Sequence, residues 1–428
     1  MKKMSSRERV RAAINHKNSD RVPIDLGAIG STGIQAGALS QLRDAYKLEK
    51  RPVKITEPFQ LLGEVEEDVR TAVQADLVGI WSPYTFFGYK NEKWKPWHLS
   101  DGTEVLVGGG FRTEVDEKGN TYLFPGNSKI PRAIMPKGGF YFDALLRQEP
   151  VDEDDLDGKR DFKDMFSVYS DDELKSIQDI TDDLYKNTDY SLVGCFGGMA
   201  LGDVALLPGL GIEYTPGIRK VEDWYMAHYL HPSYIKEIFD YQTEIAVENL
   251  KLYMQAVGDK IDIIHMSGTD FGTQKAEVMS VEMFCEFYKP YHKKANDIIH
   301  KKTNWKTSFH SCGSITNLMD DFVDMGVDIL NPVQCSAAGM DPVWLKEKYG
   351  DKLVFWGGAI DTQHTLAYGT PEEVFEEATN RLEIFSPGGG FIYNAIHNIQ
   401  QKTPVENIIA FFEAAKRFND KKQNNSSD

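Results

Sequence analysis

From about residue 190 onward, short runs of consecutive apolar residues alternate with longer stretches in which apolar residues recur every three or four positions. Short β-rich runs are typical of buried strands, and the wider spacing is typical of amphipathic helices. Six strand-helix units follow one another, with strands expected at 191–196, 261–266, 305–309, 327–330, 353–356 and 390–393. This alternation predicts an α/β fold with parallel strands joined by helical crossovers.

The N-terminal part adds two more strands, at 21–27 and 75–81, with helices expected near 34–46 and 61–73. Eight strands close a (β/α)8 TIM barrel, so we predict a single barrel domain over residues 1–418, with an N-terminal extension. Residues 88–141 interrupt the rhythm after the second strand. Their alternating pattern around the turn sequence at 116–120 predicts a β-hairpin insertion. The polar segment 419–428 is expected to be a disordered tail.

Charge and composition narrow the partners of this 428-residue chain. The formal net charge of −17 argues against a nucleic-acid or anionic-membrane surface, both of which need a basic footprint. The first residues lack the apolar core of a signal peptide, and no stretch approaches a membrane span. We therefore expect a cytoplasmic protein that binds small molecules or other proteins. The four cysteines are too few and too scattered for a disulfide framework, which leaves thiols free to bind metal.

The strand exits carry the polar residues expected of an active site, because barrel enzymes place their chemistry at the C-terminal ends of the strands. Candidate substrate-binding residues at these exits are Trp81, Gln274, Asn331, Gln334, Trp356, Asp361 and Asn394. The two tryptophans would form an aromatic wall for a flat substrate. Asp270 is a candidate general base, although an aspartate at this place also caps turns.

His310 and Cys312 are the strongest candidates for metal binding. Residues at i and i+2 of an extended segment point the same way, and imidazole and thiolate are ligands that Zn²⁺ prefers. A third ligand must come from another strand, and both His397 and Cys335 lie at suitable exits. Three protein ligands and one open position would make a catalytic zinc site. The alternative is that His310 and Cys312 are polar residues of the barrel mouth without metal.

Six stretches of the chain carry a further signal, and they are 7–23, 268–274, 310–314, 331–334, 356–358 with 361–363, and 387–391 with 397–400. Together they resemble the uroporphyrinogen decarboxylase-like superfamily, which contains porphyrinogen decarboxylases and corrinoid-dependent methyltransferases. The first strand exit, at 25–31, lacks the arginine-rich segment with which the decarboxylases bind their polycarboxylate substrate. The zinc site of the methyltransferases resembles His310-x-Cys312 plus a cysteine near the last strand, where this chain has His397.

The resemblance implies a zinc-assisted methyltransferase that moves a methyl group between a small methylated substrate and the corrinoid of a separate protein. Asp270, His310 and His397 would be the catalytic residues. The small-molecule partner would be a methoxylated aromatic, a methylamine or methylthiol derivative, or a pterin, and aromatic residues near Trp81 favour a flat substrate. A decarboxylase of a small carboxylated substrate, using Asp270 and His397, is the alternative, and a non-enzymatic scaffold for a corrinoid protein is a third reading. A homodimer is a further expectation.

Overall fold

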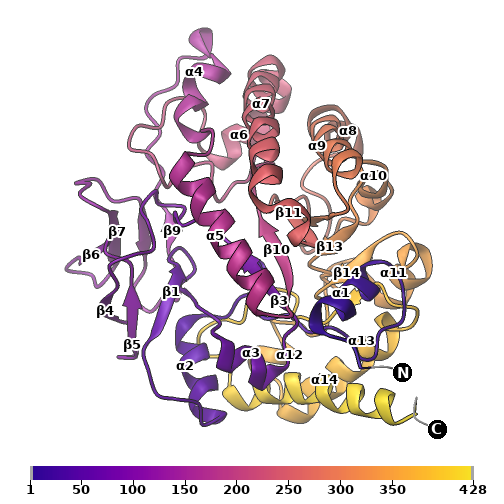
Figure 1. Cartoon of the computed structure of the whole chain (residues 1–428). Coiled ribbons are helices and arrows are strands. Elements are labelled where there is room, and N and C mark those ends of the chain that lie inside the picture. The colour runs from indigo at the N-terminus through magenta and orange to yellow at the C-terminus, as the bar shows by residue number, and fades with distance from the viewer. Residues whose placement is uncertain (1–2, 426–428) are drawn as a thin grey trace.

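A computed structural model describes residues 3–425, and a parallel seven-stranded sheet lies at its centre (Figure 1). Each strand pairs with the next one of the sheet along the chain, from β3 to β15. The strands are β3 (Leu77–Ile80), β10 (Ser191–Cys195), β11 (Ile263–Ser267), β12 (Lys306–His310), β13 (Ile329–Asn331), β14 (Val354–Trp356) and β15 (Phe391–Ile392). The α/β fold with parallel strands is confirmed.

Residues 23–25 join the two edges of this sheet. Ile24 forms a parallel bridge with Tyr393 next to β15, and the amide of Asp25 donates to the carbonyl of Tyr393 at 2.9 Å. On the other side, the amide of Asp76, just before β3, donates to the carbonyl of Ile24 at 2.7 Å. The predicted first strand is therefore reduced to one isolated β-bridge at Ile24. It nevertheless lies between β15 and β3, where an eighth strand of the sheet would lie.

Helices cover the outside of the sheet, as their apolar stripes predict. Thr370 caps α13 (Pro371–Phe385) through a capping box with Glu373, as expected of threonine before proline and acidic residues. The outer helices are α2 (Ala36–Ala45), α3 (Glu67–Val73), α4 (Gly158–Phe162), α5 (Asp171–Asn187), α6 (Val221–Leu230), α7 (Pro232–Val257), α8 (Val281–Phe287), α9 (Lys289–Lys302), α10 (Met319–Asp324), α11 (Pro342–Tyr349), α12 (Thr365–Tyr368), α13 (Pro371–Phe385) and α14 (Val405–Asn425).

The N-terminal extension forms α1 (Ser6–Ile14), which covers one end of the sheet. Its apolar residues Val10 and Ile14 belong to the inner hydrophobic cluster. The same cluster contains the first residues of several strands, namely Leu77, Ile263, Ile329 and Val354. Because α1 packs against the N-terminal ends of the strands, the opposite end, where the strand exits lie, is left for a site.

The insertion after β3 is larger than the predicted hairpin. It contains β4 (Lys95–His98), β5 (Glu104–Val107), β6 (Phe111–Val115), β7 (Thr121–Pro125), β8 (Ala133–Met135) and β9 (Asp143–Ala144). The turn at 116–120 does join β6 to β7, but β5 pairs instead with β4 and with β1 (Val53–Glu57). Two four-stranded sheets result, at the left of Figure 1.

The predicted helix at 61–73 begins only at Glu67, because Leu62 and Gly63 form β2, which pairs with β1. The predicted disordered tail is wrong over residues 419–425, since α14 continues to Asn425. The reason is the buried Asn419, whose side-chain oxygen accepts from the amide of Val22 at 2.8 Å. Residues 426–428 lie outside the described part of the chain.

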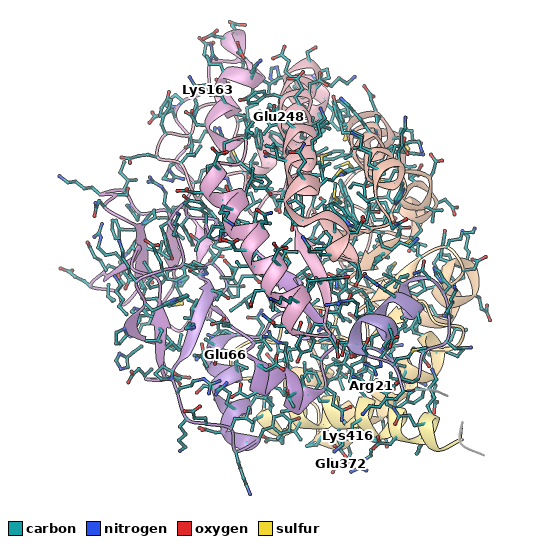
Figure 2. All side chains as sticks on the ribbon, in the orientation of Figure 1. Arg21, Glu66, Lys163, Glu248, Glu372 and Lys416 are labelled. Carbon is teal, nitrogen blue, oxygen red and sulfur yellow. The ribbon has the colours of Figure 1, made fainter. Side chains whose placement is uncertain are left out.

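Charged side chains, among them Lys163, Glu248 and Lys416, lie at the periphery of the molecule (Figure 2). A search of the helices within residues 3–425 finds none with the length and apolar content needed to cross a membrane.

Candidate metal and substrate site at the strand exits

Strands β12 and β13 bring the central residues of the site together. His310 is the last residue of β12 and pairs in register with Asn331, the last residue of β13. Cys312 follows two positions later, and His397 lies in the segment after β15. Because parallel strands end at the same side of the sheet, these residues meet although 85 positions separate Cys312 from His397.

His310, Cys312 and His397 form a group in which one ligand atom of each residue lies within 4.8 Å of the others. The His310 Nε2 and Cys312 Sγ atoms are 3.4 Å apart. Tetrahedral zinc with ordinary Zn–N and Zn–S bond lengths would separate such atoms by about 3.5 Å. The donor set and this distance therefore fit a zinc ion.

Burial sets the protonation of two members of this group. It raises the pKa of the Cys312 thiol well above its usual range, and the nearby Asp270 carboxylate adds to the shift. Burial, followed by the neighbouring His310, lowers the pKa of His397 to about 4. At neutral pH His397 therefore offers a lone pair, whereas Cys312 carries a proton that a bound cation would displace.

Asp270 lies against the same group. Its Oδ1 accepts from the backbone amide of Cys312 at 2.6 Å and lies 3.6 Å from the Nε2 atom of His310. About half of its side chain is exposed. The carboxylate thus orients the loop that carries Cys312 and is also open to a bound molecule.

A cavity of about 310 Å³ opens beside Cys312 and His397. Three predicted substrate-binding residues, Gln274, Gln334 and Asp361, are in its wall. The other lining residues are Gly272, Thr273, Gly313, Ser336, Thr362, Gln363 and Ile396. Gln363 lies two residues after Asp361, at the exit of β14.

Two amide contacts shape this cavity. Gln274 donates its Nε2 to the Oε1 of Gln363 at 2.9 Å and so joins the loops after β11 and β14. The Oε1 of Gln334 accepts from the amide of Gly313 at 2.7 Å. Both contacts hold polar side chains in the wall next to Cys312.

The remaining predicted substrate-binding residues lie elsewhere. Trp356 is fully buried, and its indole N–H donates to the carboxyl of Asp25 at 3.0 Å, so it forms no wall of the cavity. Asn394 is also buried and donates to the carbonyl of Asp25. Asn331 is buried against His310. Trp81 is exposed at the end of β3 but is not among the residues that line this cavity.

Asp25 was not predicted as a site residue. It is fully buried, and burial raises the pKa of its carboxyl to about 7 despite several hydrogen bonds that act in the opposite direction. An aspartate directly after the apolar run 22–24 was the signal in the sequence. The structure shows that this carboxyl holds Trp356 inside the sheet.

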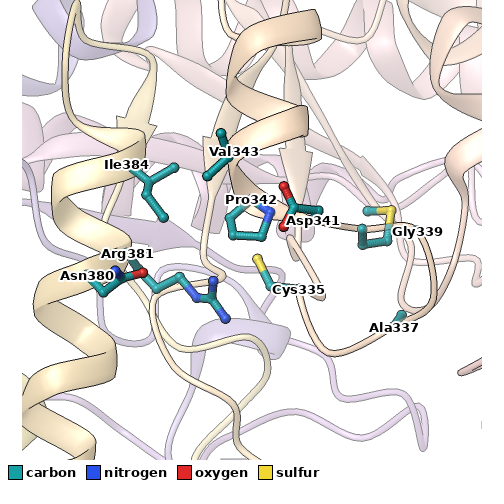
Figure 3. A pocket seen from close by; sticks show the side chains of 10 residues that line it. Cys335, Ala337, Gly339, Asp341, Pro342, Val343, Asn380, Arg381 and Ile384 are labelled. Carbon is teal, nitrogen blue, oxygen red and sulfur yellow. The ribbon is translucent and has the colours of Figure 1, made fainter.

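Cys335, the alternative third ligand, is not part of the His310, Cys312 and His397 group. It lines a separate cavity of about 520 Å³ together with Arg381 of α13 and the first residues of α11 (Figure 3). Burial raises the pKa of its thiol to about 12. The chain folds so that His397 and not Cys335 approaches Cys312.

Comparison with known proteins finds similarity to one family and to one solved fold. Residues 215–418 match the uroporphyrinogen decarboxylase (URO-D) family. Curated uroporphyrinogen decarboxylases are similar over short segments. That of Coxiella burnetii is 27% identical over 95 residues, which are 21% of this chain and 25% of the relative. That of Mannheimia succiniciproducens is 24% identical over 200 residues, 44% of this chain and 50% of the relative. The matches thus span a quarter to half of these relatives.

Among solved structures, a methyltransferase from Methanosarcina mazei is similar over 97% of this chain and 99% of its own, with a TM-score of 0.53 and 16% sequence identity. At this identity the likeness concerns the fold. The shared fold over the whole chain and the URO-D match over its C-terminal half confirm the resemblance seen in the sequence. Residues 215–418 thus match the uroporphyrinogen decarboxylase family, and the whole chain shares the fold of a methyltransferase, in agreement with the uroporphyrinogen decarboxylase-like resemblance.

Proposed function

We propose that this protein is a zinc-assisted methyltransferase that moves a methyl group between a small methylated substrate and a corrinoid carried by a separate protein. The observation that carries the proposal is the approach of His310, Cys312 and His397 to within 4.8 Å of one another at the strand exits. The fold of the Methanosarcina mazei methyltransferase supports the methyltransferase branch, and the superfamily resemblance supports the corrinoid partner.

The Nε2 of His310, the Sγ of Cys312 and a ring nitrogen of His397 would hold the zinc, which leaves a fourth position as in other catalytic sites. When bound there, zinc acts as a Lewis acid toward the heteroatom that carries or receives the methyl group. In demethylation, the methyl group would pass to the corrinoid of the partner protein and the electron pair of the broken bond would stay on the heteroatom, which His310, Cys312 and His397 would hold through the zinc.

The side chains of the cavity bind and align the substrate, because in-line methyl transfer depends chiefly on orientation. Gln274, Gln334 and Gln363 supply amide groups, and Asp361 supplies a carboxylate. Within the described part of the chain, the residues that line this cavity include no arginine, lysine, phenylalanine, tyrosine or tryptophan. A compact substrate with hydrogen-bonding groups therefore fits better than the flat aromatic one that Trp81 and Trp356 suggested.

Metal analysis tests the zinc site. Protein purified without chelator should contain about one zinc per chain, and Cys312→Ala should lose it. Cys335→Ala, which removes an equally half-buried thiol outside the group, should keep the zinc. Metal-free wild-type protein, or zinc retained in Cys312→Ala, would count against the proposal.

Methyl transfer is tested with a panel of methylated donors and a reduced corrinoid protein, followed by the absorbance change on formation of methylcobalt(III). Transfer from a compact polar donor that disappears in Cys312→Ala is expected. A decarboxylase of a small carboxylated substrate is the second candidate, because the family match is to URO-D. Release of CO2 without corrinoid, unaffected by Cys312→Ala, would favour it, although the Asp361 and Asp270 carboxylates oppose an anionic substrate.

A further inference from the structure

We propose that Asn331, supported by Ser31, is a positioning residue that fixes the proton of His310 on Nδ1 and so turns the lone pair of Nε2 toward Cys312 and His397. The consequence for metal affinity depends on the proposed function. The tautomer itself is a property of the chain alone and can be measured without metal.

The orientation of the Asn331 side-chain amide follows from its three neighbours. Asn331 is fully buried, and its Nδ2 donates to the backbone carbonyl of Trp356 at 3.0 Å. A carbonyl oxygen can only accept, so the amide nitrogen must face Trp356 and Oδ1 must face the other way. There Oδ1 accepts from the hydroxyl of Ser31 at 2.8 Å.

The same Oδ1 atom lies 2.7 Å from Nδ1 of His310. Because an amide oxygen has no proton to give, the contact is a hydrogen bond only if Nδ1 of His310 carries the proton. The other ring nitrogen, Nε2, is then an acceptor in the neutral ring. It is also the atom that lies 3.4 Å from Cys312 Sγ, where a metal would bind.

Backbone pairing keeps the two side chains in place. His310 and Asn331 are partners in the register between β12 and β13, and the amide of Ser311 donates to the carbonyl of Asn331 at 2.8 Å. His310 is only 6% exposed, so water has little access to replace Asn331. Ser31 comes from the exit of segment 23–25, which means that the N-terminal end of the fold helps to orient a ligand on β12.

The hydrogen bond between His310 and Asn331 would matter for metal binding. A group that accepts from the second ring N–H of a ligand histidine fixes its tautomer and ring orientation, and its loss typically weakens metal binding by about 10- to 100-fold. Asn331 was predicted to bind substrate; buried behind His310, it acts instead on the metal through the histidine.

The direct test is ¹⁵N NMR of histidine side chains in the metal-free protein, with His310 assigned by its loss in His310→Gln. We expect Nδ1 protonated and Nε2 unprotonated in the wild type. In Asn331→Ala the two tautomers should mix. Asn331→Asp loses the donor to the Trp356 carbonyl but keeps an acceptor opposite Nδ1, so Nδ1 of His310 should stay protonated, which a purely structural role for Asn331 would not predict.

Zinc affinity, measured by competition with a chromophoric chelator, should fall about 10- to 100-fold in Asn331→Ala. It should fall less in Ser31→Ala, which removes only the support of Oδ1. Asn296→Ala is the matched control, because Asn296 is equally buried and also donates to a backbone carbonyl, but lies in α9 away from the site. Circular dichroism shows which variants are folded. If Asn331→Ala does not fold, the tautomer of His310 and the zinc affinity are measured in Ser31→Ala instead.

A wild-type His310 with its proton on Nε2, or mixed tautomers, would overturn the proposal. So would unchanged tautomer and zinc affinity in folded Asn331→Ala, or an equal loss of affinity in Asn296→Ala. If the wild type binds no zinc, the proposed function fails, whereas the NMR result still decides the role of Asn331.

Discussion

Zinc binding should release one proton from Cys312 per zinc at pH 7.5. Burial and Asp270 hold the pKa of this thiol well above its usual range, so the free protein carries the thiol almost entirely protonated. Zinc binds the thiolate and must displace that proton. His397 adds none at this pH, because burial lowers its pKa to about 4 and it is already neutral.

Each proton displaced makes zinc affinity rise about tenfold, or about 1.4 kcal/mol, per unit of increasing pH, as long as the pH stays below the pKa of the thiol. We expect this slope of one between pH 7.5 and 8.5.

Isothermal titration calorimetry measures the released protons directly, by repeating the titration in two buffers with different ionisation enthalpies. The control is Cys335→Ala, which removes another buried thiol with a raised pKa and should still release about one proton. Zinc binding by the wild type without proton release, or one proton released by Cys312→Ala, would refute the assignment of Cys312 as a ligand.

Two further predictions concern the fold around the site. The pKa of the Asp25 carboxyl is raised to about 7, so the folded protein holds a proton that the unfolded chain loses near pH 4. Its contribution to stability is present below pH 4 and falls by up to about 4 kcal/mol as pH rises to 7; Asp25→Asn should remove this slope from the dependence of Tm on pH. Asp76 is fully buried between Arg9 at 2.6 Å and Arg21 at 2.8 Å, and Asp76→Asn should lower the free energy of unfolding by about 3–5 kcal/mol in urea titrations.

The controls for these two variants use the same measurements. An unchanged slope in Asp25→Asn would mean that another group titrates. For Asp76, the matched control is Asp179→Asn, which breaks an exposed ion pair with Lys175 and should cost no more than about 0.5 kcal/mol. A cost as small as this in Asp76→Asn would contradict the argument from burial.

The strands and helices of the repeating part of the fold could be predicted from the amino-acid sequence alone, and so could the placement of His310 and Cys312 on the same side of the chain. These two predictions depend only on residues that are close together in the sequence. The spacing of apolar residues identifies each element, and an i, i+2 spacing in extended chain places two side chains on one side. The polar strand exits also predicted Gln274, Gln334 and Asp361 in the wall of the cavity, because all parallel strands end at the same side.

Elements without such local signals were missed. The short strands β1 and β2 are defined by their pairing with β5 and with each other, and residues 419–425 appear polar although Asn419 is held by Val22 at the other end of the chain. The structure of these segments depends on contacts with residues far away in the sequence. The local pattern of apolar and polar residues carries no information about such contacts.

Tertiary packing selects His397 over Cys335 as the third member of the metal group, and it also places Trp356 and Asn331 in the interior. All four follow strands or end them, so position in the sequence made them equivalent. The direction in which each side chain points depends on how the strand exits pack against neighbouring loops. That packing turns Cys335 toward α13, draws Trp356 to the buried Asp25, and sets Asn331 against His310.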